Sequence, residues 1–180
     1  MPFQGRSLGQ ISQEFTDHLN HILNTTVTQR RLRRIMINTG VATIGIQEHA
    51  RVSRALIRTS YGPMELDLRQ TCDAVTDEVT GLLRLRTLSY RYAIAPEGDP
   101  EPLLRWEFIR LPADPDATWC RHHFQGPIGL GIHNRNGEEA HLNRWHLPTG
   151  GVAIEDVLRF CITDLGVRPL SGDWDQQLRP

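Results

Sequence analysis

The sequence contains no lysine: all 20 of its basic residues are arginine. This absence excludes Schiff-base chemistry and every mechanism that needs a lysine nucleophile. It also means that any anion bound by the chain is held by guanidinium groups, whose planar fork suits phosphate and carboxylate.

Cysteine and long apolar runs are scarce as well. The 3 cysteines, Cys72, Cys120 and Cys161, are too widely spaced for a disulfide framework or a zinc ribbon. No stretch approaches the roughly 18 apolar residues of a membrane-spanning helix. The opening residues, MPFQGRSLGQ, lack the apolar core of a signal peptide. We therefore expect a cytoplasmic protein without a membrane partner.

Three common catalytic signatures are also missing. The glycine-rich stretch GPIGLGI is not followed by the GK[ST] of a phosphate-binding loop, and neither HExxH nor GxSxG occurs. Nucleotide binding of the P-loop type, zinc-protease chemistry and serine-hydrolase chemistry therefore have no support. The sequence predicts no cofactor.

Charge is distributed unevenly although the net charge is only −1. Residues 28–60 carry seven arginines and one glutamate, whereas residues 64–80 carry five acids and one arginine. Either the acidic segment packs on the basic one, or the basic segment stays open for a phosphate-bearing partner. In the second case we expect non-specific nucleic-acid binding, with a steep salt dependence, by Arg30, Arg31, Arg33 and Arg34.

The N-terminal region, residues 1–82, is predicted to be mostly helical. Apolar residues recur at helical spacing over 11–23. A short basic helix is expected over 29–38, a strand over 41–47, and a helix over 48–58. The last would place three arginines on one face, namely Arg51, Arg54 and Arg58. Residues 64–82 are compatible with a strand followed by a short helix.

The C-terminal region, residues 83–180, has the alternation of an antiparallel sheet. Strands are expected over 82–94, 103–111, 119–125 and 140–147, and a phase change near Thr87 indicates a bulge. A strongly amphipathic helix follows over 154–166. The two regions together predict one compact α+β unit. Its antiparallel meander is covered by a C-terminal helix and preceded by an arginine-rich, mostly helical part.

Two adjacent histidines lie in the stretch TWCRHHFQGP. Neighbouring strand residues point to opposite faces, so His122 and His123 cannot serve the same site. His122 shares a face with Phe124, whereas His123 shares a face with Arg121 and Gln125. We therefore expect His122 to be packed and hydrogen-bonded, and His123 to face solvent.

One hypothesis is a metal-independent nuclease acting on RNA. A neutral histidine would take the proton of a ribose 2′-hydroxyl, and arginines would stabilise the phosphoryl charge. His123 would be the acid or base with His146 as its partner, and Glu107 would orient a histidine or an arginine. His141 lies on the same expected strand as His146. The predicted phosphate ligands are Arg91, Arg105, Arg121 and Arg144.

Two alternatives remain open. A metal site could combine His122 or His123 with His141 or His146 and Glu107, but this spacing matches no closed tetrahedral signature. The chain could instead be a non-enzymatic interaction or nucleic-acid-binding subunit with structural histidines. A nuclease requires at least two of His123, His141 and His146 on one exposed, arginine-lined surface. An interaction protein would bury or disperse them and expose an apolar patch elsewhere.

The order of four short motifs, SYRYAI, PLLRWEF, RHHFQG and IEDVL, resembles the TumE-like toxins of bacterial toxin–antitoxin pairs. The resemblance covers residues 89–165. It implies a compact α+β fold, action on RNA and a cognate antitoxin or assembly partner, and it is compatible with a homodimer. The matching positions are Tyr90, Arg91, Tyr92, Arg105, Trp106, Glu107, His122 and His123. Phe124 and Gln125 stand where the family has a lysine and a further histidine.

Overall fold

The computed structural model describes residues 3–38, 40–48, 51–113, 121–127, 129–141 and 147–179. Helix α1 (Leu8–Thr26) confirms the helix predicted over 11–23 and extends it at both ends. It begins after Ser7, whose hydroxyl accepts a hydrogen bond of 3.2 Å from the Gln10 main-chain nitrogen. Its apolar stripe is buried, so packing against the sheet stabilises the helix.

The main element is a 10-stranded sheet in the described part of the chain. Its paired strands are antiparallel, and its order is β12-β9-β8-β7-β6-β3-β2, with β5 also paired to β6. Strands β10 and β11 form a separate hairpin. The strands are β1 (Gln4–Gly5), β2 (Leu32–Asn38), β3 (Val41–Glu48), β4 (Arg51–Val52), β5 (Ala55–Thr59), β6 (Gly62–Thr76), β7 (Leu83–Pro96), β8 (Leu104–Ile109), β9 (His122–Gln125), β10 (Gly129–His133), β11 (Glu139–His141) and β12 (Leu147–Pro148).

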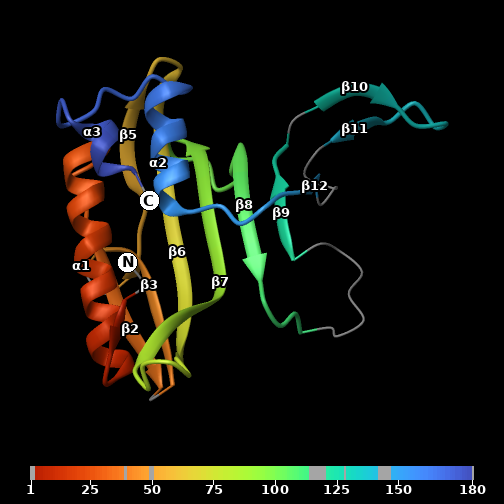
Figure 1. Cartoon of the computed structure of the whole chain (residues 1–180). Coiled ribbons are helices and arrows are strands. Elements are labelled where there is room, and N and C mark those ends of the chain that lie inside the picture. The colour runs from red at the N-terminus through yellow and green to blue at the C-terminus, as the bar shows by residue number, and fades with distance from the viewer. Residues whose placement is uncertain are drawn as a thin grey trace.

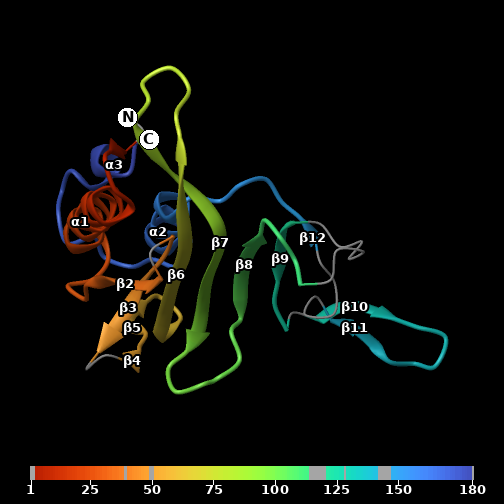
Figure 2. The same cartoon turned by 90° about the horizontal axis from the view of Figure 1, so that it is seen from below.

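Helices α1 and α2 (Ile154–Thr163) lie on the same face of the sheet, as Figures 1 and 2 show from two directions. The short helix α3 (Trp174–Gln177) lies beside α1, and the β10–β11 hairpin extends away from the helices. The core between helices and sheet contains fully buried Leu23, Leu66, Leu68, Ile94 and Leu158. The α+β class with a large antiparallel sheet is thus confirmed. None of the described helices combines the length and apolar composition that crossing a membrane requires.

Two of the expected N-terminal helices are strands, so the prediction of a mostly helical first region is wrong. Residues 32–38 form β2, which pairs with β3 through a hairpin. Arg51, Arg54 and Arg58 do not share a helix face, because 51–52 and 55–59 are β4 and β5. In β5, Ala55 and Ile57 are buried and alternate with exposed residues. Alternation of buried and exposed residues is typical of a strand, and here it indicates the structure better than the helical spacing of the arginines does.

The bulge predicted near Thr87 is present. Thr71 pairs with Ser89 and Cys72 with Thr87, which leaves Leu88 as the extra residue. The shift brings Thr87 onto the same face of β7 as Tyr90. Strands β6 and β7 pair along almost their full length, so the sheet continues across residue 82.

The region after β9 agrees only in part with the prediction. The glycine-rich stretch, for which no strand was predicted, contains β10, which forms a hairpin with β11. Of the strand expected over 140–147, β11 ends at His141 and β12 begins at Leu147. Strand β12 does pair with β9, through Leu147 opposite Phe124. Residues 142–146 lie outside the described residues.

Candidate functional site

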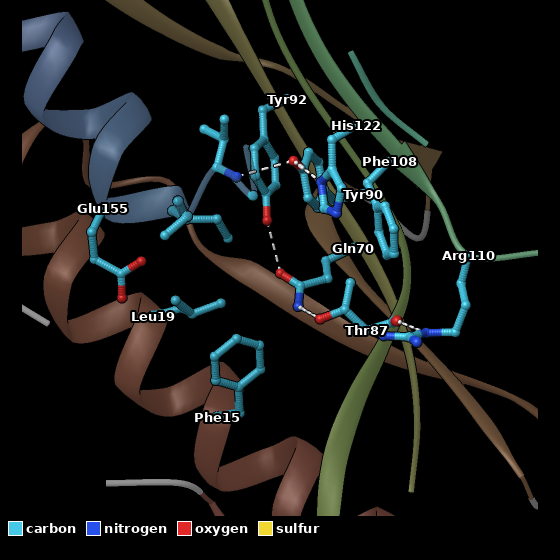
Figure 3. A pocket seen from close by; sticks show the side chains of 14 residues that line it. Phe15, Leu19, Gln70, Thr87, Tyr90, Tyr92, Phe108, Arg110, His122 and Glu155 are labelled. Carbon is cyan, nitrogen blue, oxygen red and sulfur yellow. Dashed lines mark hydrogen bonds between the residues drawn. The ribbon is translucent and has the colours of Figure 1, made fainter. Parts of the chain in front are cut away.

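A pocket of about 450 Å³ lies between the helices and the sheet, at the start of α2. Figure 3 shows Phe15 and Leu19 of α1 and Glu155 of α2 on one side of it, and aromatic and polar residues of the sheet on the other. Its lining consists of Phe15, Leu19, Gln70, Thr87, Tyr90, Tyr92, Phe108, Arg110, His122, Gly151, Val152, Ala153, Ile154 and Glu155.

His122 enters this pocket from β9 and is held in a defined orientation. Its Nδ1 lies 3.1 Å from the Tyr90 hydroxyl, which in turn accepts a hydrogen bond of 3.1 Å from the Val152 main-chain nitrogen. Its ring stacks on Phe108 with 4.2 Å between ring centroids and 15° between planes. Within the described part of the chain, Nε2 has no hydrogen-bond partner. One nitrogen is therefore fixed while the other stays available.

The Tyr90 hydroxyl suits both neutral forms of the His122 ring. It can donate to Nδ1 when the ring proton is on Nε2, and it can accept from Nδ1 when the proton is there. Desolvation by burial raises the pKa of Tyr90, so its hydroxyl stays protonated. Tyr90 is thus a positioning residue that allows the imidazole to gain and lose a proton without losing its partner.

The environment of His122 favours the neutral imidazole. Partial burial lowers its pKa below the ordinary value, and the nearby positive charge of Arg110 lowers it further. A lowered pKa means that the ring is mostly deprotonated at neutral pH. A neutral imidazole with an available nitrogen can accept a proton.

Arg110 supplies the positive charge of the pocket. Its Nε donates a hydrogen bond of 2.9 Å to the Thr87 carbonyl, and its guanidinium lies 5.7 Å from the centre of the Phe108 ring. The main-chain nitrogen of Arg110 also bonds the carbonyl of Leu88, the extra residue of the β7 bulge, at 2.8 Å. The guanidinium is therefore anchored through one nitrogen beside the aromatic wall.

On the sheet side of the pocket, three lining residues are joined by hydrogen bonds between their side chains. The Tyr92 hydroxyl donates to Gln70 Oε1 at 2.9 Å, and Gln70 Nε2 donates to Thr87 Oγ1 at 3.0 Å. Tyr92 and Tyr90 stack with 4.6 Å between their ring centroids. These groups already satisfy one another, so they shape the pocket and hold its aromatic surface rigid.

The structure corrects the expectation that His123 faces solvent. His123 does lie on the opposite face of the sheet from His122, as parity predicted, but its exposed fraction is only 4%. Its Nε2 lies 3.3 Å from Glu107 Oε2. This face holds enough opposite charges to bury polar side chains, which alternation alone does not reveal.

Glu107 is the centre of this network, whose arginines are partly exposed, and it contacts both a histidine and arginines. Its Oε1 lies 3.3 Å from Arg91 and its Oε2 lies 3.2 Å from Arg105. Arg91 also reaches Asp67 at 3.2 Å. The structure therefore brings four of the predicted site residues together, His123, Glu107, Arg91 and Arg105. They lie on the face opposite the pocket, where carboxylates pair with both arginines.

We expect Glu107→Gln to destabilise the fold. The change removes the charge that holds two arginines and His123; because the two arginine pairs are partly exposed to solvent, each contributes at most about 1 kcal/mol to stability. The free energy of unfolding, measured by denaturant titration, should fall by about 1–3 kcal/mol. Glu14→Gln, on the exposed side of α1, should change it by less than about 0.5 kcal/mol. Equal effects of the two changes would contradict this assignment.

The remaining predicted residues are not brought into the pocket by the described structure. Arg121 is exposed immediately before β9, and His141 ends β11. His146 and Arg144 lie outside the described residues. The N-terminal arginines lie at the far edge of the sheet, where Arg30, Arg31 and Arg33 are exposed and Arg34 is half-buried. Among the described residues, no group of three histidine, cysteine or carboxylate side chains could hold a metal ion.

Sequence reasoning missed Arg110 and Glu155. Arg110 follows Trp106 and Phe108 at a spacing of two, and this parity places it on their face. The sequence alone therefore indicated that Arg110 lies on the aromatic face of this strand. Glu155 lies outside the apolar stripe of the C-terminal helix, and only the position of α2 over the sheet places it at the pocket.

The chain was also compared with known proteins. No protein-family model matches it, and neither the curated proteins nor the solved structures give a match. A functional assignment therefore has to rest on the residues and geometry of the site.

Proposed function

We propose that the chain is a metal-independent, RNA-directed nuclease of toxin type in which His122 is the acid–base residue. The observation that carries this proposal is the arrangement of the His122 imidazole. Its Nδ1 is fixed by Tyr90, its Nε2 is available, and it stands in a pocket that Arg110 also lines. This assignment replaces His123, which is buried on the other face.

The proposed reaction is transfer of a phosphoryl group within the RNA chain. His122 Nε2 takes the proton of a ribose 2′-hydroxyl as O2′ forms a bond to phosphorus. The bond from phosphorus to the 5′-oxygen breaks, and that oxygen takes up a proton from the imidazolium or from water. The products are a 2′,3′-cyclic phosphate and a 5′-hydroxyl, and Arg110 neutralises the charge that develops on the phosphoryl oxygens.

The aromatic surface of the pocket supports a nucleotide as the ligand. Phe15 and His122, both half-buried, line it together with the buried rings of Tyr90, Tyr92 and Phe108. Unpaired bases stack on partly exposed rings such as the first two, and each stacked base contributes about 1–3 kcal/mol. A volume of about 450 Å³ falls within the range of small-molecule sites. Single-stranded RNA is therefore the preferred substrate class, since its bases are free to stack.

The proposal is tested by incubating the purified protein with end-labelled single-stranded RNA in the presence of EDTA. We expect cleavage that EDTA does not reduce, with cyclic phosphate ends. The same oligonucleotide with 2′-deoxyribose throughout should stay intact, because it lacks the attacking hydroxyl. Cleavage of the deoxy substrate, or none of either substrate by folded protein, would contradict the mechanism.

The lowered pKa of His122 predicts the pH dependence of cleavage. Since the neutral imidazole is the base, kcat/KM should rise with pH and level off above a midpoint below 6.5, the ordinary value. Arg110→Gln removes a charge that lowers this pKa, so the midpoint should move upward in addition to the loss of rate. A midpoint above 6.5 in the wild type would argue against His122 as the base.

A second candidate is a non-enzymatic interaction subunit of a toxin–antitoxin or defence assembly. The burial of His123 favours it, because the nuclease expected from the sequence needed two of His123, His141 and His146 on one exposed surface, and His123 is not exposed. The RNA assay decides between the two. Folded protein that leaves RNA intact would leave this second candidate as the better assignment.

A further inference from the structure

Strand β2 forms one edge of the sheet, and among the described strands it pairs with β3 alone. Within the described residues, its outer side is covered only at its beginning. At Leu32, the Asn20 side chain of α1 bonds both main-chain groups: Asn20 Oδ1 accepts from the nitrogen at 2.7 Å, and Nδ2 donates to the oxygen at 3.0 Å. Leu32 therefore directs its main-chain groups away from β3.

The same geometry leaves the next positions of β2 open. Register with β3 is unbroken from Leu32, opposite Ile46, to Met36, opposite Ala42. Because main-chain groups alternate in direction along an antiparallel strand, Arg34 and Met36 also point theirs outward. No described residue forms a hydrogen bond with these groups. The edge thus offers two donors and two acceptors in the spacing of a strand.

The side chains along this open edge are apolar and exposed. The exposed fractions are 43% for Ile35, 37% for Met36 and 62% for Ile37. Soluble proteins usually block an open edge with charges, proline or a covering segment, because an apolar edge pairs with other strands. Here the three aliphatic residues occupy the second half of the strand, beside the open main-chain groups that strand addition uses.

The charge beside this edge is of one sign. Residues 28–47 contain four arginines and no acid. In the described part of the chain, no carboxylate forms an ion pair with Arg31, Arg33 or Arg34, and Arg34 donates instead to the Gln13 side chain at 3.3 Å. A strand that pairs with β2 therefore lies beside arginines at the start of β2 and beside aliphatic side chains towards its end.

We infer that β2 binds an extended, acidic segment of a partner protein, which adds to the sheet as a further strand. Its main chain would occupy the open groups of Arg34 and Met36, its carboxylates would pair with the arginines, and its aliphatic side chains would cover Ile35 and Ile37. RNA fits less well, because β2 has no aromatic side chain for base stacking. A second copy fits less well because two arginine-rich strands would repel.

The test uses a short synthetic peptide in which glutamate alternates with valine, with binding measured by isothermal titration calorimetry. A control peptide of the same sequence carries N-methyl groups on alternate amides, so it keeps the charge but cannot form the ladder. The decisive variant is Met36→Pro, which removes an outward N–H and no hydrogen bond to β3, so that an edge strand tolerates it. Met36→Leu is its matched control.

We expect the unmethylated peptide to bind, and both N-methylation and Met36→Pro to weaken binding by more than about tenfold while Met36→Leu does not. Thermal unfolding should show Met36→Pro to be folded. If the methylated peptide bound equally well, charge alone would account for the interaction, and the proposal of strand addition would be wrong. Binding of single-stranded RNA but not peptide, abolished by Arg33→Glu, would assign the edge to nucleic acid. A dimer that Met36→Pro dissociates would assign it to a second copy.

Discussion

Replacing His122 by alanine is expected to reduce the rate of RNA cleavage by about 10²–10⁴-fold, the usual contribution of a positioned acid–base residue. The change removes the only imidazole that the described structure places in the pocket. It leaves Tyr90 and its hydrogen bond from Val152 in place. Single-turnover cleavage of labelled RNA, with protein in excess, measures this loss without a contribution from product release.

Two further histidine variants make this result specific. His133→Ala changes an exposed histidine of the β10–β11 hairpin and should retain the wild-type rate. His123→Gln should lower the free energy of unfolding, because it disturbs the Glu107 network, while the folded fraction keeps its activity. Wild-type activity in His122→Ala, or full loss only in His123→Gln, would contradict the assignment of the base.

Replacing Leu66 by alanine is expected to be among the most destabilising single changes. Leu66 is fully buried in β6, the strand that pairs with β5 on one side and β7 on the other. Truncation of such a leucine costs about 2–5 kcal/mol, because it combines lost transfer free energy with a cavity. For a chain of this size the melting temperature should fall by about 4–20 °C.

Leu56→Ala is the matched control for this change. Leu56 belongs to the neighbouring strand β5, but 48% of it is exposed. Its truncation should alter the free energy of unfolding by less than about 0.5 kcal/mol. Circular dichroism during thermal and denaturant unfolding gives both values. A loss as large for Leu56 as for Leu66 would show that the core described here is wrongly placed.

How much of the fold could be predicted depended on whether local pattern and tertiary context agreed. In α1 and α2 the apolar stripe, the ends and the burial all indicate a helix, and both helices were predicted. Around 29–38 a basic segment before Gly40 suggested a helix, and around 48–58 the arginine spacing did, whereas pairing with β3 and β6 required strands. These partners follow directly along the chain as hairpins, but strand formation depends on pairing and on burial in the sheet, which the residue types of one segment do not reveal.

The candidate site was predictable in part for a similar reason. Strand parity correctly separated His122 from His123, and the predicted partners of Glu107, a histidine or an arginine, do lie beside it. It could not show which face is covered by helices and which by an ion network. That information depends on α2 packing over β7 and β8, where Val152 reaches Tyr90. The pocket therefore had to be found in the structure.

The central claim, that the pocket around His122 is where a nucleotide binds, is tested most directly by NMR. The imidazole resonances of all histidines are followed as a nucleoside 3′-monophosphate is added, and again across pH. We expect the signals of His122 to shift and its pKa to rise, because a phosphate bound beside the ring stabilises the imidazolium. The signals of the exposed His133 should not change. Unchanged His122 signals at saturating nucleotide, or equal shifts at both histidines, would contradict the claim.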